Sequence, residues 1–161
     1  MSDSGTPRMS PEFLRRVRLF EALEVPELAE ILMLGVVKEY AKDDVIFEEG
    51  SPGDSFFVIY GGAVRISKLF PQMGEEALTI LEAGEFFGEM SFFDDDPRSA
   101  RAIAHEAAKL LEVKNSNLKT HLASRPGVAL KFLWAFSSTL SQRVRDTNAK
   151  FSTLFAISRV F

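Results

Sequence analysis

The sequence contains no cysteine, and this absence excludes a disulfide framework, a thiolate metal site and a thiol nucleophile. Its two histidines, His105 and His121, are too few for a three-histidine zinc site. No run of about 18 apolar residues occurs that could span a bilayer, and residues 1–8 lack the apolar segment of a signal peptide. These absences exclude most classes of metalloenzyme, and we expect a cytoplasmic protein without a membrane segment.

Charge of either sign is not in large excess. The 161 residues include 19 Lys and Arg against 23 Asp and Glu, a formal net charge of −4, which argues against the nucleic-acid backbone as the main partner. With 46% hydrophobic residues, the chain is long enough for one ordinary core and too short for two full-sized domains.

The beginning of the chain differs in composition from its middle. Residues 1–9 are rich in Ser, Gly and Pro and are predicted to form a disordered leader. Ser10 followed by Pro11 predicts a helix start, and the apolar residues that follow keep helical spacing. A second helix is expected from near Pro26 to Gly35. Two short helices therefore precede the rest of the chain.

Between residues 36 and 113, short β-branched and aromatic runs alternate with clusters of Gly, Pro and Asp. This pattern is typical of an antiparallel β-barrel or jelly roll, so the predicted fold class is α+β, mainly β. The expected strands are Val36–Tyr40, Val45–Phe47, Phe56–Tyr60, Val64–Leu69, Ala77–Leu81, Arg101–Ala104 and Leu110–Val113.

A short helix near residues 115–122 and a long helix from Pro126 to about residue 150 or beyond complete the predicted elements. The spacing of apolar residues on the long helix is close to that of a packed helix pair. We expect its first half to pack on the chain's own core and its second half on a second copy, forming a homodimer. The chain then divides into the leader, a core of residues 10–125, and a C-terminal helix and tail of residues 126–161. The stripe on the long helix consists of Leu133, Phe136, Leu140, Val144, Thr147, Phe151 and Leu154.

Residues 84–100, with the sequence GEFFGEMSFFDDDPRSA, interrupt the strand pattern in the middle of the β-rich region. A glycine followed by helix-compatible residues predicts a short helix whose free N–H groups attract an anion. Arg98 follows Glu89 by nine residues and supplies a planar cation suited to phosphate oxygens. A carboxylate beside such an anion is suited to accept a hydrogen bond from a sugar hydroxyl. The segment therefore predicts a site for a phosphorylated ribose.

Two parts of this segment, Phe87–Met90 and Pro97–Ala100, resemble the phosphate-binding cassette of cyclic nucleotide-binding domains, which occur in catabolite activators, kinase regulatory subunits and channels. Phe56–Val64 is similar to the central hairpin of that family, and Leu19–Leu23 to its N-terminal helical segment. The resemblance covers about residues 19–148. It implies ligand-binding roles for Phe87, Gly88, Glu89, Met90, Arg98, Ser99, Ala100 and Thr79.

The resemblance also implies a role for each group. Arg98 would pair with the cyclic phosphate and Glu89 would accept the ribose 2′-hydroxyl. Backbone N–H groups near Gly88, Ser99 and Ala100 would complete the phosphate cradle. No bond is made or broken, so the chain is expected not to be an enzyme and to need no cofactor. The resemblance further implies that the core binds the cyclic nucleotide and that the C-terminal helix is a lid that covers the base and moves on binding.

The preferred base is only weakly indicated. Ser99 stands where a threonine tends to favour guanine in the family, which puts cAMP ahead of cGMP as the ligand. The spacing of Glu89 and Arg98 is that of kinase and channel domains, one residue shorter than in the catabolite activator. Strand residues expected to face the base are Ile66, Leu78 and Thr79, and the alternatives for the lid residue that touches it are Thr139, Arg143 and Asn148.

Simpler interpretations compete with this one. Arg98 could form only a surface ion pair with the three aspartates of residues 94–96, which lack the alternating spacing of a metal loop. Glu85 and Glu89 as an acid–base pair have no nucleophile or histidine nearby in the sequence. A cupin-type metalloenzyme would need more histidines, and the 15 phenylalanines are explained by the core of a small β-fold.

The sequence therefore favours a non-enzymatic cyclic-nucleotide sensor that passes binding to its C-terminal helix and acts on an unknown downstream protein. The alternative is an interaction or scaffold module of the same fold that binds no nucleotide. A transcription activator of the family carries a winged helix of about 70 residues after the long helix. Only about ten residues follow Lys150, so no direct DNA binding is expected. Met1 and the leader favour a self-standing protein over a fragment of a larger one.

Overall fold

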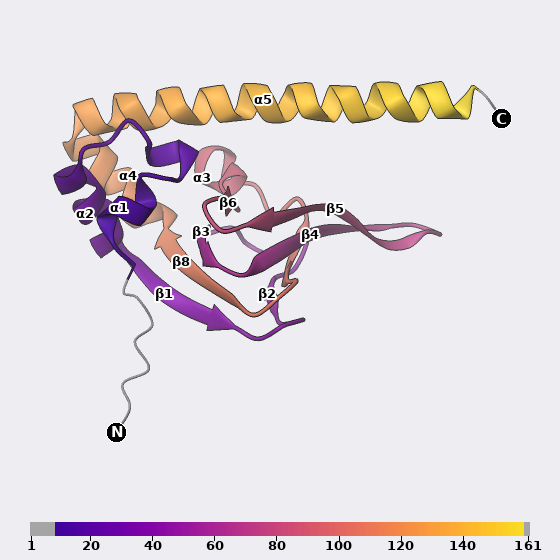
Figure 1. Cartoon of the computed structure of the whole chain (residues 1–161), viewed down its shortest axis with the longest axis horizontal. Coiled ribbons are helices and arrows are strands. Elements are labelled where there is room, and N and C mark those ends of the chain that lie inside the picture. The colour runs from indigo at the N-terminus through magenta and orange to yellow at the C-terminus, as the bar shows by residue number, and fades with distance from the viewer. Residues whose placement is uncertain (1–8, 160–161) are drawn as a thin grey trace.

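The computed structural model describes residues 9–159 and consists of two four-stranded antiparallel β-sheets with most of the helices at one end (Figure 1). Most neighbouring strands are far apart in the sequence, as in a jelly roll. The first sheet has the order β1 (Gly35–Tyr40), β8 (Ala108–Lys114), β3 (Ser55–Gly61) and β6 (Phe86–Phe87). The second has the order β2 (Val45–Phe47), β7 (Arg101–Ala104), β4 (Ala63–Phe70) and β5 (Gly74–Glu82).

The predicted mainly β, jelly-roll class is confirmed, but the sheets are not closed into a barrel. Each sheet has one very short edge strand: β2 has three residues and β6 has two. Strands of this length form too few ladder hydrogen bonds to join one sheet to the other. Seven strands overlap the seven predicted runs. The eighth, β6, was not predicted because two residues carry no periodic signal.

Strand β3 lies inside the first sheet and is buried on both faces. Phe57 and Ile59 point toward the second sheet and join the apolar cluster between the two sheets. Phe56 and Val58 point the other way and belong to the cluster formed with the helices. This double burial explains why the five residues from Ser55 onward are all buried, whereas a strand with one solvated face would alternate.

The N-terminal helical region is more broken than predicted, because a turn and a short 3-10 helix follow the first helical turn. Ser10 Oγ accepts a hydrogen bond from the Phe13 N–H at 3.3 Å, as an N-cap does. The predicted leader falls outside the described residues except for Met9, which packs in the apolar cluster beneath the helices. The helices are α1 (Pro11–Leu14), η1 (Arg18–Phe20), α2 (Val25–Leu34), α3 (Met90–Asp94), α4 (Asn115–Ser124) and α5 (Pro126–Ser158).

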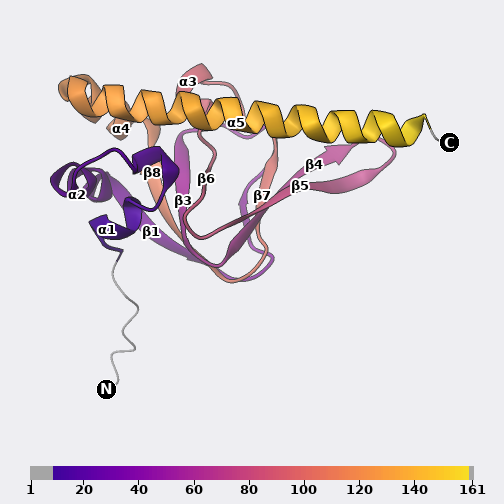
Figure 2. The ribbon, with the colours of Figure 1, turned by 45° about the horizontal axis from the view of Figure 1, so that its top comes forward.

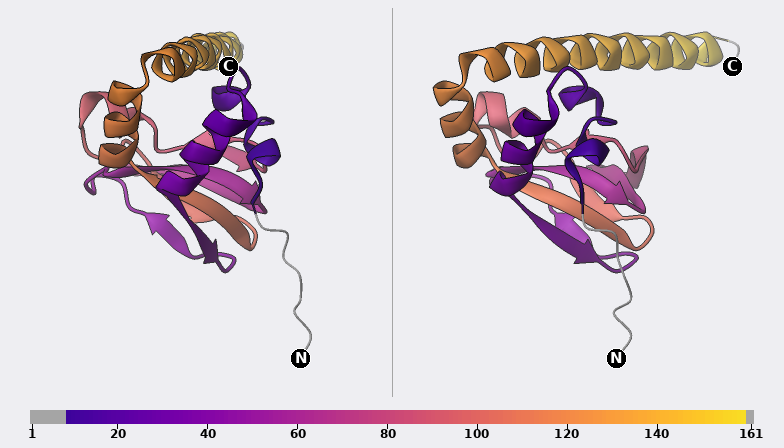
Figure 3. Two further views of the ribbon diagram at one scale, coloured as in Figure 1. Left: turned by 90° about the vertical axis from the view of Figure 1, so that its left-hand side faces the viewer. Right: turned by 60° about the vertical axis from the view of Figure 1, so that its left-hand side comes forward.

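Helix α5 begins at the end of the molecule where α2 and α4 lie and runs above the sheets to the opposite end (Figures 1 and 2), and Figure 3 shows it above the sheets from two further sides. Its N-terminal half packs on the core through Val128, Phe132 and Phe136. Although α5 is long, it is not apolar enough to cross a membrane, and no other helix among residues 9–159 is both long and apolar enough to do so. Beyond Phe136 the apolar residues of the predicted stripe are 42–64% exposed: Leu140, Val144, Phe151 and Leu154.

A buried carboxylate ties three strands of the first sheet together. Glu112 of β8 is 8% exposed, accepts a hydrogen bond from Ser55 Oγ of β3 at 2.9 Å, and is ion-paired with Lys38 of β1. Burial raises the pKa of Glu112, but the hydrogen bonds from Lys38 and Ser55 and the nearby positive charges outweigh burial and hold it below its usual value. The folded chain therefore favours the ionised carboxylate.

We expect Glu112→Gln to lower the free energy of unfolding at pH 7 by about 1–3 kcal/mol, because Lys38 loses its buried partner. The folded-state pKa lies below the unfolded one, so this stabilisation is present above the unfolded pKa. It is lost as the pH falls below the ordinary carboxyl pKa and through the lower folded one. Urea unfolding at pH 7 and pH 3 should therefore show a smaller difference between wild type and variant at pH 3.

The matched control for this prediction is Glu39→Gln, which removes an exposed carboxylate paired with Lys109 across the same two strands. Such exposed pairs add little to stability, so the control should unfold nearly as the wild type does. Equal losses in the two variants, or a Glu112→Gln loss at pH 3 as large as at pH 7, would contradict the prediction.

Candidate ligand-binding site

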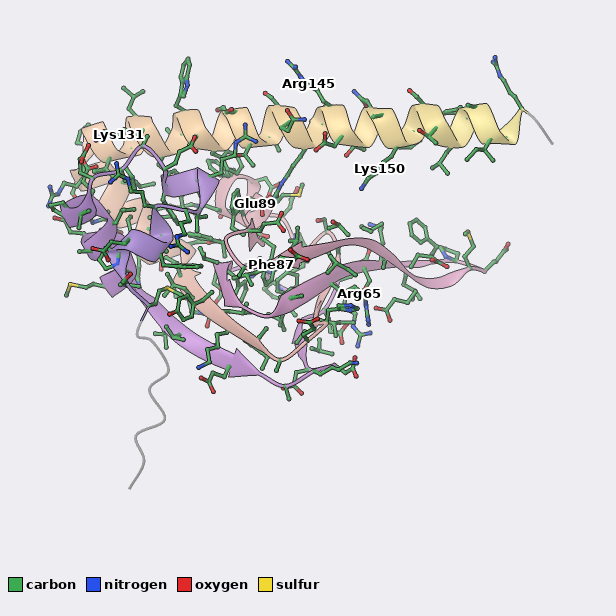
Figure 4. The ribbon with its side chains drawn as sticks, in the orientation of Figure 1. Arg65, Phe87, Glu89, Lys131, Arg145 and Lys150 are labelled. Atoms are coloured by element: carbon green, nitrogen blue, oxygen red, sulfur yellow. The ribbon has the colours of Figure 1, made fainter. Side chains whose placement is uncertain are left out.

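Residues 85–100, strands β4 and β5, and helix α5 surround a cavity of about 390 Å³. Much of the apolar wall comes from the second sheet, the polar groups come mainly from residues 85–100 and from α5, and α5 covers one side (Figure 4). All eight residues predicted to bind ligand line this one cavity: Phe87, Gly88, Glu89, Met90, Arg98, Ser99, Ala100 and Thr79.

The side chain of Arg98 is held in the wall of this cavity by neutral atoms. Arg98 is 5% exposed, and its Nη1 and Nη2 donate to the carbonyl oxygens of Gly88 at 2.9 Å and Ser55 at 2.6 Å. Its Nε is buried and has no hydrogen-bond partner among residues 9–159, and no ion pair of Arg98 occurs there. A buried cation without a counter-ion is costly, so the cavity favours an anionic ligand.

Burial lowers the pKa of Arg98 from its ordinary value, and the negative charges of Asp54, Glu112 and Glu89 oppose that effect. An arginine side chain nevertheless keeps its charge at any pH at which the protein is folded. The cavity therefore contains a permanent cation with N–H groups to spare.

The backbone around Arg98 is closely packed. Gly88 has φ +76°, and a Cβ built there would lie 2.7 Å from Arg98 Nη1. The Arg98 N–H donates to the Ser51 carbonyl and the Gly50 N–H donates to the Arg98 carbonyl, both at 2.8 Å. These contacts tie the cassette to the loop between β2 and β3 and set where the guanidinium lies.

The second predicted polar group, Glu89, already has a cationic partner. Glu89 is 7% exposed and is ion-paired with Arg143 of α5. Arg143 also donates from Nη2 to the Phe86 carbonyl at 2.9 Å, and its guanidinium lies 4.7 Å from the centre of the Phe86 ring. The carboxylate expected to meet a sugar hydroxyl therefore also holds the helix expected to act as the lid.

The remaining predicted residues complete the walls of the cavity. Ser99 Oγ lies 3.7 Å from Met90 Sδ, and the Ser99 carbonyl accepts a hydrogen bond from Lys68 Nζ at 3.1 Å. Phe87 is buried and stacks on Phe57, with ring centres 5.1 Å apart. The three strand residues expected to face the base, Ile66, Leu78 and Thr79, all line the cavity.

The sequence allows three positions for the lid residue, and only one of them lines the cavity. Arg143 lines the cavity. Thr139 is buried, and its hydroxyl donates to the Ala135 carbonyl at 2.9 Å. Neither Thr139 nor Asn148 is among the residues that line the cavity.

Seven lining residues were not predicted to meet the ligand, and three of them, Leu81, Glu85 and Ser91, stand close in sequence to predicted ones. The other four lie elsewhere in the chain. Asp146, Thr147 and Lys150 follow Arg143 by three, four and seven positions, so they share its helix face. That spacing is the signal that could have identified them. In Figure 4 the Lys150 side chain points toward the sheets, whereas Arg145 points away from them. The fourth residue, Phe47 of β2, lies at an irregularity of the strand that the sequence does not indicate.

The simpler interpretation of Arg98 as a surface ion pair is wrong for the described residues. Asp95 instead pairs with Lys119 at 2.9 Å, and Asp94 accepts a hydrogen bond from the Asp96 N–H at 3.0 Å. Within residues 9–159, no group of three or more His, Cys, Asp or Glu side chains could hold a metal ion.

The fold and the cavity together define a jelly roll with a buried cation in the wall of a cavity. The family model described as the cyclic nucleotide-binding domain matches residues 37–125, more than half of the chain. The chain therefore belongs to the cyclic nucleotide-binding domain family.

The chain is similar to transcriptional regulators and to a cyclic-nucleotide-dependent kinase. It is 29% identical over 143 residues to the CRP-like cAMP-activated global transcriptional regulator of Mycobacterium tuberculosis, a match that covers 89% of this chain and 62% of that protein. It is 40% identical over 97 residues to cGMP-dependent protein kinase, isozyme 1, of Drosophila melanogaster, covering 59% of this chain and 13% of the kinase. The N-terminal domain of a transcriptional regulator from Streptomyces coelicolor A3(2) superposes with a TM-score of 0.72 and 35% identity, covering 85% of this chain and 95% of that domain. The chain thus spans less than two thirds of the length of the mycobacterial relative.

We expect Gly88→Ala to lower the free energy of unfolding more than Gly84→Ala does, by at least about 1 kcal/mol. Both glycines have positive φ, but a Cβ at Gly84 meets no atom within 4 Å, whereas one at Gly88 meets Arg98. Both variants pay the cost of a side chain at positive φ. The difference between their free energies of unfolding therefore measures the close packing of Gly88 on Arg98. Urea unfolding measures it, and equal losses would show that Gly88 is needed for its φ alone.

Proposed function

We propose that this chain is a non-enzymatic sensor of a 3′,5′-cyclic purine nucleotide, with cAMP ahead of cGMP. The observation that carries the proposal is the buried Arg98 guanidinium, which lacks a counter-ion among residues 9–159 and shares a cavity with Glu89. The guanidinium would receive the cyclic phosphate and the carboxylate would accept the ribose 2′-hydroxyl. The apolar wall that includes Ile66 and Leu78 would contact the base.

Ser99 and the relatives support the choice of ligand. One relative is named as cAMP-activated and another as cGMP-dependent, so the family accommodates both bases. Ser99, in place of the threonine associated with guanine, favours adenine. The cavity volume of about 390 Å³ lies in the range of small-molecule sites.

The proposed output is a change in the position of α5. The ribose hydroxyl and Arg143 would use the same Glu89 carboxylate, and the Arg143–Glu89 pair is a contact that joins the cassette to α5. Binding would therefore change the free energy of that contact and shift the population of helix positions. A downstream protein that recognises α5 would read the shift.

We also propose that the exposed stripe on the second half of α5 joins two copies of the chain. Val144, Phe151 and Leu154 are more than half exposed and follow the spacing of a packed helix pair. An identical helix presents the same stripe in the same order, so a two-fold pair buries both.

The alternative, an interaction module that binds no nucleotide, would use the same helix surface. The uncompensated Arg98 favours the sensor, because a disused pocket gains nothing from burying a cation. A melting temperature that rises with added nucleotide supports the sensor. Association of the chain that no nucleotide changes, with a constant melting temperature, supports the module.

Calorimetric titration with cAMP and cGMP tests the sensor. We expect saturable binding that is tighter for cAMP, and Arg98→Ala should weaken it at least about thirtyfold, since a charge-assisted pair contributes about 2–4 kcal/mol. Arg145→Ala is the matched control, because this arginine points away from the cavity (Figure 4). Absence of heat and of a thermal shift up to millimolar nucleotide would falsify the proposal.

Sedimentation velocity tests the dimer. We expect the wild type to sediment as a dimer and Val144→Glu to sediment as a monomer, because a buried carboxylate in a helix pair lacks a partner. Arg145→Glu places the same side chain on the neighbouring position and should remain dimeric. A wild-type monomer, or equal effects of the two substitutions, would contradict the proposal.

A further inference from the structure

The Phe47 ring is in cation–π contact with Arg98, the arginine of the proposed phosphate site. The Arg98 Cζ atom lies 4.1 Å from the centre of the Phe47 ring and 5.9 Å from that of Phe57. Phe47 stands where the register of β2 on β7 shifts, between Val45 and Phe47. Such irregularities re-aim side chains, and here Phe47 lines the cavity as well as the core.

The ring supplies a restraint that the hydrogen bonds of Arg98 do not. The two bonds from Nη1 and Nη2, to Gly88 and Ser55, restrain where one edge of the guanidinium lies. Contact with an aromatic face restrains the tilt of the guanidinium plane and stabilises the cation without neutralising its charge. The remaining N–H groups, including Nε, which has no hydrogen-bond partner in the described part of the chain, are then held in one orientation.

The Phe47 ring is itself supported by two buried rings. Its centre lies 5.9 Å from that of Phe57 and 5.8 Å from that of Phe87, and these two stack on each other at 12°. Phe57 and Phe87 are 4% and 3% exposed, so neither moves without disturbing the core between the sheets. The surface that Arg98 meets is therefore rigid.

We propose that Phe47 is a positioning residue for the phosphate end of the cavity. Its ring sets the plane of the Arg98 guanidinium, and that plane decides which oxygens of a cyclic phosphate receive hydrogen bonds. This inference rests on the proposed function, since it assigns a role within the same site. Two other roles predict different results: a filler of the core, and a contact for the base.

The test compares Phe47→Leu, which removes the ring and keeps apolar volume, with Phe47→Tyr, which keeps the ring. The matched control is Ile46→Ala, which removes apolar volume from the same strand and the same cluster. Affinities are measured by calorimetry for cAMP and for its two phosphorothioate diastereomers, in which sulfur replaces one or the other exocyclic phosphate oxygen. The ratio of the two diastereomer affinities does not depend on the fraction of folded protein, so it remains valid for a variant that folds poorly.

We expect the wild type and Phe47→Tyr to distinguish the diastereomers. Phe47→Leu should bind cAMP roughly five- to tenfold more weakly, and its ratio of diastereomer affinities should be at least about threefold smaller than that of the wild type. Ile46→Ala should keep both values. In combination with Arg98→Ala, Phe47→Leu should cause no further loss, because the ring acts through the arginine.

Four results would overturn the inference. An unchanged ratio with weaker binding of all ligands would make Phe47 a filler or a base contact. Wild-type affinity in Phe47→Leu, or a further loss of affinity in the double variant, would show that Phe47 does not act through Arg98. These three leave the proposed sensor intact, whereas failure of the wild type to bind any of the ligands overturns the sensor and the inference together.

Discussion

The site depends on a buried guanidinium that is held by neutral atoms. Two carbonyl oxygens, those of Gly88 and Ser55, accept hydrogen bonds from Arg98, and its charge has no counter-ion within residues 9–159. A carboxylate in the same place would stabilise the folded chain more but would compete with an anionic ligand. Within the described residues the charge of Arg98 stays unpaired, so an anionic ligand can pair with it.

Holding such a group requires support from the whole β-structure. Ser55 begins β3, a strand buried on both faces, and its hydroxyl donates to Glu112 of the neighbouring strand β8, which is ion-paired with Lys38 of β1. Gly88 adopts a positive φ and leaves no room for a side chain beside the guanidinium. The two carbonyl groups that hold the arginine thus belong to β3 and to the residue after β6, both from the first sheet, although the arginine reaches the cavity from the segment between β6 and β7.

The strands, the long helix and the cassette could be predicted because each has a local signal. The seven longer strands are runs between turn residues, and Arg98 and Glu89 stand in a motif that a single sequence displays. β6 is too short to have a period, and open sheets differ from a barrel only in long-range pairing. The Arg143–Glu89 pair joins residues 54 positions apart, and Phe47 reaches the cavity through a register shift. Contacts of this kind depend on tertiary structure, which residue spacing does not encode.

The length of α5 has a mechanical consequence. The helix is anchored on the core through Phe132 and Phe136 and touches the cassette at Arg143, and it then continues for fifteen residues to Ser158. That part is about 22 Å long, so in the proposed movement of α5 it would act as a lever with its fulcrum near Arg143. A tilt of roughly 10° would move the far end by about 4 Å. The proposed sensor would in this way enlarge a displacement of atomic size at the cavity to the size of a side chain at Ser158.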